Sequence, residues 1–138
     1  MAVINYQNLP STATPLNATN LNNMQVQESG SNSNGNYIKY ADGTLIQWNY
    51  IEVTDQAIAN QYGNTALYIG SRTITFPIAF VGNTPSVQCS QFRWGTGGSW
   101  GTSGQATLTT ATLNGYDFYS RATGTTCYIG WIAIGKWK

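Results

Sequence analysis

The sequence predicts an all-β protein, namely an antiparallel β-sandwich of six to seven strands with an extended N-terminal arm. Three observations favour this fold class. Short stretches with strand-like alternation of apolar and polar residues recur along residues 36–138. Turn dipeptides that contain glycine, Asp42-Gly43 and Asn114-Gly115, lie between such stretches. Charged residues make up only 8% of the chain, whereas 15 glycines and 13% aromatic residues are typical of a fold with many turns.

Residues 1–28 differ from the rest and are predicted to form an arm. Pro10 and Pro15 disfavour helix in the residue before each, so the chain should stay extended to about residue 17. A short helix capped by Thr19 should follow, with Leu21 and Met24 on one side. Such a helix is too short to be stable alone in water, so we expect the arm to bind a partner.

A flexible linker and a hairpin should follow the arm. Residues 29–35 are Ser, Asn and Gly only, which is the composition of a linker, and the head domain is therefore predicted at 36–138. Asp42-Gly43 predicts a two-residue turn that pairs Tyr40 with Leu45. Both faces of this hairpin are then apolar: one carries Ile38, Tyr40, Leu45 and Ile51, and the other carries Tyr37, Ile46, Trp48 and Tyr50.

Further strands are predicted at 66–76 and 86–94. Asn114-Gly115 predicts a second hairpin over 107–121, because Asn-Gly is the strongest short turn signal. Residues 126–137 are apolar on both sides, which is typical of a central strand. The core face of the second hairpin should hold Ala111, Leu113, Tyr116 and Phe118, and its opposite face should hold Thr110, Thr112, Asp117, Tyr119 and Arg121.

Cys89 and Cys127 both fall within predicted strands. Buried free thiols are favoured over a disulfide, because an unpaired Cys packs as a small hydrophobic residue. Strict alternation along 86–94 would place Cys89 on the face opposite Phe92 and Trp94.

The two doubly apolar strands predict an oligomer. A sandwich buries only the inner face of each sheet, so a second apolar face needs cover of its own. We expect Trp48, Tyr50 or their neighbours to contact another copy of the chain. The alternative is that the polar loop 54–65, with a helical turn near 57–60, folds over this face. A net charge of +1 opposes self-association only weakly.

Composition argues against several functional classes. The near-zero net charge supplies no basic surface for nucleic acid. No stretch resembles a signal peptide or is long enough to cross a membrane. The absence of His excludes His-based triads and ordinary His metal sites, so no metal or other cofactor is expected. A glycosidase needs two carboxylates about 5–10 Å apart, for which Glu52 with Asp55 or Asp117 is the remaining option, and we do not expect an enzyme.

A sugar-binding surface is better supported. Sugars bind to flat aromatic faces with hydrogen-bonding neighbours, since they present both C–H patches and hydroxyl groups. Two regions offer such groups, one beside the Gly-rich segment 95–104 and one on the polar face of the second hairpin. The alternative is that the tryptophans pack on the end of the sandwich and the polar residues form a subunit contact or a solvated face. The candidates are Arg93, Trp94, Trp100, Asp117, Tyr119 and Arg121, with Trp100 favoured because glycines surround it.

Three segments resemble a known family. "YIKYADGTLIQW" (37–48), "TFPIAF" (75–80) and "WIAIGKW" (131–137) resemble motifs of the C-terminal domains of bacteriophage tail fibres, which are related in pattern to H-type lectin domains. The resemblance implies a trimeric β-sandwich at the tip of a fibre that recognises a host-surface glycan. Residues 5–24 also resemble arms that attach appendage proteins to virions.

Together these observations predict a virion fibre protein, made in the host cytoplasm, whose arm binds another virion protein and whose head binds carbohydrate. The absence of a shaft between arm and head leaves its position open among the tail, neck and capsid. The second hypothesis is a structural appendage or decoration protein that binds no glycan.

Overall fold

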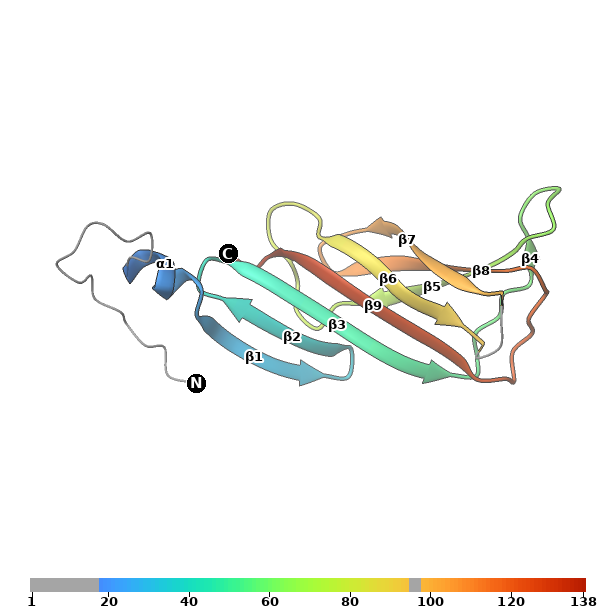
Figure 1. Cartoon of the computed structure of the whole chain (residues 1–138), viewed down its shortest axis with the longest axis horizontal. Helices are drawn as coiled ribbons and strands as arrows, with labels where there is room; N and C mark the ends of the chain where they lie inside the picture. The colour runs from blue at the N-terminus through green and yellow to red at the C-terminus, as the bar shows by residue number, and fades with distance from the viewer. Residues whose placement is uncertain (1–17, 95–97) are drawn as a thin grey trace.

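The computed structural model describes residues 18–94 and 98–138 and confirms the predicted fold class. These residues form two antiparallel sheets that pack as a sandwich, with one short helix beside them (Figure 1). The elements are α1 (Ala18–Asn23), β1 (Val26–Asn32), β2 (Gly35–Tyr40), β3 (Thr44–Val53), β4 (Asn60–Gln61), β5 (Tyr68–Thr75), β6 (Ser86–Arg93), β7 (Trp100–Ala106), β8 (Thr110–Asp117) and β9 (Cys127–Lys136).

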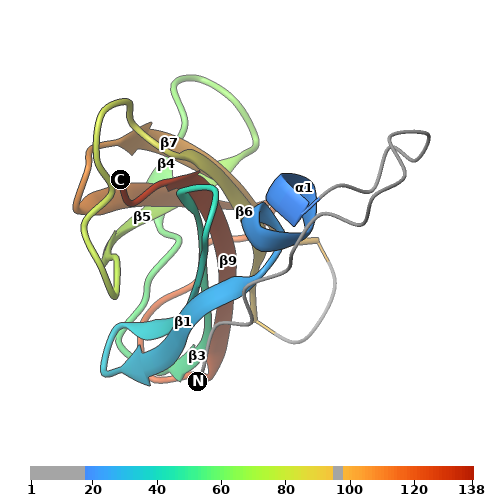
Figure 2. The same ribbon diagram turned by 90° about the vertical axis from the view of Figure 1, so that its left-hand side faces the viewer.

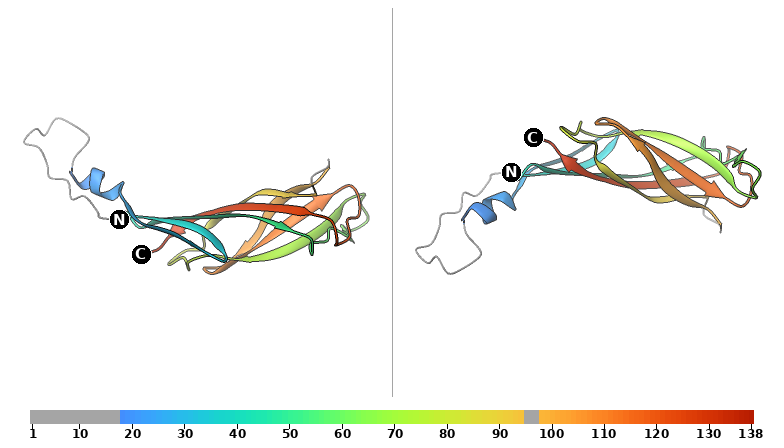
Figure 3. Two further views of the ribbon diagram at one scale, coloured as in Figure 1. Left: turned by 90° about the horizontal axis from the view of Figure 1, so that it is seen from below. Right: turned by 90° about the horizontal axis from the view of Figure 1, so that it is seen from above.

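The two layers differ in strand number. The five-stranded sheet has the order β1-β2-β3-β9-β6, and the four-stranded sheet has the order β4-β5-β8-β7. The layers lie face to face, with α1 beyond one end of them (Figure 3). Viewed towards that end, β6 of one sheet lies beside β7 of the other (Figure 2). As predicted, the last strand is central, because β9 pairs with both β3 and β6.

The core lies between the sheets and is rich in aromatic residues. Phe76 packs edge-on against Phe80 and Trp131, with ring centroids 5.0 and 5.7 Å apart respectively. Other fully or nearly fully buried side chains include Leu45, Ile58, Phe92, Leu113, Ile129 and Ala133. Among the described residues, no helix is long and apolar enough to cross a membrane.

The first predicted hairpin is present, but its register is displaced by one residue. Lys39, rather than Tyr40, pairs with Leu45. The cause is a longer turn, in which the Asp42 carboxylate accepts bonds from the backbone N–H and the hydroxyl of Thr44, at 2.7 and 3.0 Å. These bonds also lower the pKa of Asp42. Because side chains alternate, the slip exchanges the two faces of β2, so Ile38 and Tyr40 face outward with Ile46.

The prediction of a flexible linker at 29–35 was wrong. Val26–Asn32 is strand β1, which pairs with β2, and its turn follows at 33–34. Its contacts offset the weak strand preference of Ser and Gly. Glu28 accepts bonds from Tyr37 and Lys39 at 2.7 and 2.8 Å, and the bond from Lys39 is the main cause of its lowered pKa. The sheet therefore begins at Val26, ten residues before the predicted boundary.

The second predicted hairpin does not form. Asn114-Gly115 lies inside β8, where Asn114 pairs with Ser71 and Thr102. The glycine is needed for packing, because a Cβ at Gly115 would overlap the ring of Phe92. Gly115 therefore supplies space for a core ring, and the hairpin signal is overridden by tertiary contacts.

Both cysteines are free and buried, as predicted. Burial raises the pKa of the Cys127 thiol to about 11. The predicted faces of 86–94 were wrong, because β6 contains a register shift between Cys89 and Gln91. This bulge brings Cys89, Phe92 and Trp94 all into the core.

Three local predictions also need correction. Thr19 lies inside α1 and so cannot be its N-cap. No helical turn forms near 57–60, where Ile58 is buried and bridges to Arg121 before β4 begins. The strand count of six to seven was low, because β1, β4 and β7 lie in segments that composition marks as linker or loop.

Candidate functional site

Four exposed or partly exposed aromatic side chains gather at one end of the four-stranded sheet. They are Tyr62, Trp100, Tyr116 and Phe118, which we call the aromatic platform. Trp100 on β7 lies directly across the strand ladder from Tyr116 on β8. Tyr62 follows β4 and Phe118 follows β8. Three strand ends of one sheet therefore supply the platform.

The rings of the platform are in mutual contact. Trp100 stacks on Tyr116, with centroids 5.6 Å apart and an interplanar angle of 17°. Phe118 lies 5.6 Å from Trp100 at a tilt of 53°, and Tyr62 meets Tyr116 edge-on at 6.1 Å. Exposed fractions are 40% for Trp100, 52% for Tyr62 and 56% for Phe118, so much of this apolar surface is accessible to a ligand.

Glycines let the platform form above a packed core. Gly101 follows Trp100, and a Cβ there would overlap the Cys89 sulfur. Gly115 precedes Tyr116 and makes room for Phe92. Gly101 and Gly115 have no side chains on the inner face, so the two sheets can approach closely there. Their neighbours Trp100 and Tyr116 project outward.

The platform lies at the end of the sandwich opposite α1. In Figure 1, α1 is at the left end, whereas β4, the last residues of β8 and the start of β7 are toward the right. Helix α1 and the platform are therefore separated by the length of the strands.

Polar side chains adjoin the platform on the same face. The Ser71 hydroxyl donates a hydrogen bond to the Asn114 side-chain oxygen at 2.7 Å. Thr102 pairs with Asn114 from the other side, and its side chain is exposed. Flat rings beside hydroxyl and amide groups are the combination that a sugar ring requires.

The three predicted binding residues near the Gly-rich segment lie in different surroundings in the structure. Trp100 belongs to the platform, and residues 95–97 lie outside the described residues. Trp94 is buried, with 6% exposure, so the prediction that it forms part of a surface site was wrong. The alternative, that this tryptophan packs in the sandwich, is the one observed. Arg93 is exposed, but it ends β6 in the other sheet.

The predicted Asp117–Tyr119–Arg121 strip is not a shared polar face. Asp117 is fully buried. Its carboxylate accepts bonds from the Tyr119 backbone N–H at 2.8 Å and from Arg121 Nε at 3.0 Å. Arg121 also lies over the Tyr119 ring, 5.7 Å from its centroid. The Asp117 carboxylate therefore holds residues 119–121 in place after β8. Of these three predicted residues, Tyr119 is the one with a largely exposed side chain, at 69%.

Sequence reasoning missed three of the four platform residues. Tyr116 and Phe118 were assigned to the core face of a hairpin that does not form, and Tyr62 was assigned to a polar loop. Burial alternates along β8 from Thr110 to Asp117, with the even-numbered residues less buried. Tyr116 is predicted on the outward face of the sheet only if Gly115 is assigned to a strand and not to a turn.

Two of the three carboxylates considered for catalysis have other contacts, and the third, Glu52, is exposed on β3. Asp55 pairs with Arg72 at 3.0 Å, and Asp117 pairs with Arg121. Within the part of the chain that the structure describes, no group of three His, Cys, Asp or Glu side chains could hold a metal ion.

A second apolar surface covers the outside of the five-stranded sheet. Trp48 pairs with Ile132, and Ile46 pairs with Ile134. Ile132 and Ile134 are 37% and 45% exposed, and Tyr50, which stacks on Tyr128, is 57% exposed. Loop 54–65 does not cover this surface, because its strand β4 pairs with β5 in the other sheet. We call it the outer β3–β9 face.

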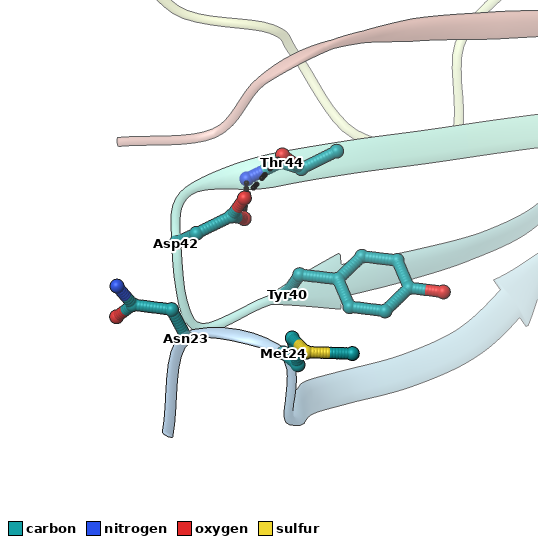
Figure 4. Close-up of a pocket in the computed structure, with 5 residues that line it drawn as sticks. All are labelled: Asn23, Met24, Tyr40, Asp42 and Thr44. Atoms are coloured by element: carbon teal, nitrogen blue, oxygen red, sulfur yellow. Dashed lines mark hydrogen bonds between the residues drawn. The ribbon is translucent and has the colours of Figure 1, made fainter. Parts of the chain in front are cut away.

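A shallow hollow of about 320 Å³ lies beside α1 (Figure 4). It lies between the end of the helix and the turn of the first hairpin. Its lining is mainly apolar, and Met24 is 70% exposed. The lining residues are Asn23, Met24, Tyr40, Asp42 and Thr44.

No protein-family model matches this chain, and neither does any curated protein sequence. Solved structures do resemble it. An N-truncated R1-type pyocin tail fibre, solved at 1.7 Å, aligns over 85% of this chain and 91% of its own, with a TM-score of 0.52 and 20% identity. The fold resembles that of pyocin tail fibres.

Two longer pyocin fibres are also similar. A Pseudomonas aeruginosa R1 pyocin fibre comprising C-terminal residues 323–701 aligns with a TM-score of 0.50 and 21% identity over 78% of this chain. An N-truncated R2-type pyocin fibre gives 0.49 and 20% over 81%. This chain spans only 28% and 39% of those two fibres. At such identities the likeness to pyocin fibres concerns the fold alone, and the likeness to H-type lectin domains remains a prediction.

Proposed function

We propose that this chain is a receptor-binding fibre protein of a virion or phage-tail-like particle, and that its head binds carbohydrate on the host surface. The observation that carries the proposal is the exposed aromatic platform at the end of the sandwich opposite α1. A fibre must attach at one end and present its binding surface at the other, and this polarity matches that requirement.

Carbohydrate is the proposed ligand because of the chemistry of the platform. The C–H faces of sugar rings pack on Trp100 and its neighbours, while Ser71, Thr102 and Asn114 supply neutral hydrogen-bonding groups. Two of the three carboxylates considered for catalysis, Asp55 and Asp117, are each paired with an arginine. We therefore propose binding without catalysis and without a metal or other cofactor.

The outer β3–β9 face is proposed as the contact between three copies of the chain. This face is built by Trp48, Tyr50, Ile132 and Ile134, and the last three are at least 37% exposed. Exposed apolar patches commonly mark interfaces. Three copies would place three platforms on one fibre and raise the avidity for a surface that bears many identical glycans.

Residues 1–28 are proposed to bind another virion protein. Most of this segment lies outside the described residues, but its last part includes α1 and the start of β1. The exposed Met24 and the hollow beside it supply apolar surface at this end. The tail, the neck and the capsid are all possible positions on the particle.

The competing hypothesis is a structural appendage that binds no glycan. Labelled purified protein, applied to a panel of bacterial strains before and after periodate oxidation of their surface sugars, separates the two. The proposal expects binding to at least one strain and its loss after periodate. Binding that survives periodate, or binding to no strain, would favour the structural role or a protein receptor.

A further inference from the structure

The outer face of the four-stranded sheet continues beyond the platform as a row of small hydroxyl side chains. Strand register places Ser71 beside Asn114, Thr73 beside Thr112, and Thr75 beside Thr110. Thr102 extends the first of these rows on β7. Ser71, Thr73, Thr75 and Thr102 are exposed, and the three β8 residues are partly exposed. We call this surface the hydroxyl strip.

The hydroxyl strip and the platform form one continuous surface. Tyr116, Asn114, Thr112 and Thr110 alternate along β8 on the outward side. From Tyr116 to Thr110 the strand advances by six residues, which corresponds to about 20 Å at the usual rise of a strand. Such a length exceeds one sugar ring and suits an extended chain of several rings.

This surface is uncharged over its described length. The outward residues of β5, β7 and β8 named above include no Asp, Glu, Lys or Arg. The charged residues that these strands and their ends do carry are engaged elsewhere: Arg72 pairs with Asp55, and Asp117 pairs with Arg121. An anionic ligand would lose its hydration here without gaining an ion pair, which is unfavourable.

We infer that the ligand is an uncharged polysaccharide whose chain runs along β8, with terminal or internal rings stacked on the platform and following units hydrogen-bonded to the hydroxyl strip. The inference rests on the proposed function. It adds that the glycan is uncharged, that it is longer than one sugar ring, and that it lies along β8. Hydroxyl groups suit this role because each can donate and accept, as sugar hydroxyls do.

The test begins with a printed array of purified bacterial surface polysaccharides, sorted into uncharged and anionic members. A retained polysaccharide is then cleaved by partial hydrolysis, and the affinity of each fragment length is measured. The variants are Trp100→Ala, the double variant Thr73→Val/Thr112→Val, and the control Thr84→Val, whose residue is exposed outside this sheet. Thr73→Ala alone replaces the double variant if that protein unfolds.

We expect uncharged polysaccharides to be retained and affinity to rise roughly tenfold or more from disaccharide to longer fragments, as two or three additional neutral hydrogen bonds would produce. The double variant should bind short fragments normally but lose this rise, and Thr84→Val should follow the wild-type curve. The inference is overturned if only anionic members bind, if the double variant retains the rise, or if it changes the oligomeric state. The first two results would leave the proposed function intact. If no polysaccharide is retained, both fail.

Discussion

The side chain of Gln47 forms two hydrogen bonds with the backbone of Ile78. Its Nε2 donates to the Ile78 carbonyl at 2.8 Å, and its Oε1 accepts from the Ile78 N–H at 2.7 Å. Gln47 is fully buried on β3, and Ile78 belongs to the "TFPIAF" segment, which begins at the last residue of β5. Two of the sequence motifs that resemble tail-fibre domains are thus joined by one amide side chain.

Gln47→Leu should therefore destabilise the fold. Leucine fills a similar volume but leaves a backbone donor and acceptor in the interior without partners, at a cost of about 2–4 kcal/mol in the free energy of unfolding. Urea denaturation measures this value. Gln105→Leu, at an exposed position of β7, is the control and should change stability by less than about 0.5 kcal/mol. Equal effects of the two substitutions would show that the Ile78 bonds contribute little.

Gly115→Ala should also destabilise the protein, although alanine is normally tolerated better than glycine in a strand. The added methyl group would overlap the ring of Phe92, which is fully buried. Overpacking of this kind costs about 1–3 kcal/mol. The thermal unfolding midpoint is the measurement, with Ser103→Ala on β7 as the control. A midpoint that matches or exceeds that of the wild type would show that the core adjusts without strain.

The outer β3–β9 face should hold the copies of the chain together. Light scattering of the wild type at micromolar concentration should give three times the 15.0 kDa mass of one chain. Ile134→Lys, which places a charge on this apolar face, should give monomers. Tyr119→Lys changes an exposed side chain that follows β8 of the other sheet and should leave the mass unchanged. A wild-type monomer would contradict the trimer directly.

Removal of residues 1–24 should leave the fold and the oligomeric state unchanged but prevent incorporation into particles. The deletion must stop there, because a chain that begins at Asn36 would lose strand β1 as well as the arm. Circular dichroism and light scattering report on the fold, and immunoblots of purified particles report on incorporation. Truncated protein on particles at the wild-type level would show that the arm is not the anchor.

The sequence was sufficient for the fold class because apolar alternation and low charge do not depend on knowing which strands meet. The boundaries of the strands and the faces on which their side chains lie were less predictable, because each depends on a particular tertiary contact. Gly115 resembles a turn residue until Phe92 is placed beneath it. Ser29 and Gly30 resemble a linker until β2 pairs with them.

The platform followed the same pattern. Trp100 could be chosen from its glycine neighbours alone, because a large ring with few local partners is expected to be accessible. Tyr116 could not be placed with it, because the cross-strand pair exists only in the correct register of β7 with β8. The buried Asp117 likewise looked like a surface residue until its bond with Arg121 was known.

The adsorption of a Trp100→Ala protein tests the central proposal most directly. Equilibrium binding of the labelled protein to a susceptible strain should weaken by roughly tenfold or more, the equivalent of about 1.4 kcal/mol per site. Stability should fall by less than about 1 kcal/mol, since the ring is 40% exposed. Met24→Ala, which removes an exposed apolar side chain at the opposite end, should adsorb as the wild type does. Unchanged adsorption by Trp100→Ala would contradict the assignment of the platform as the receptor-binding site.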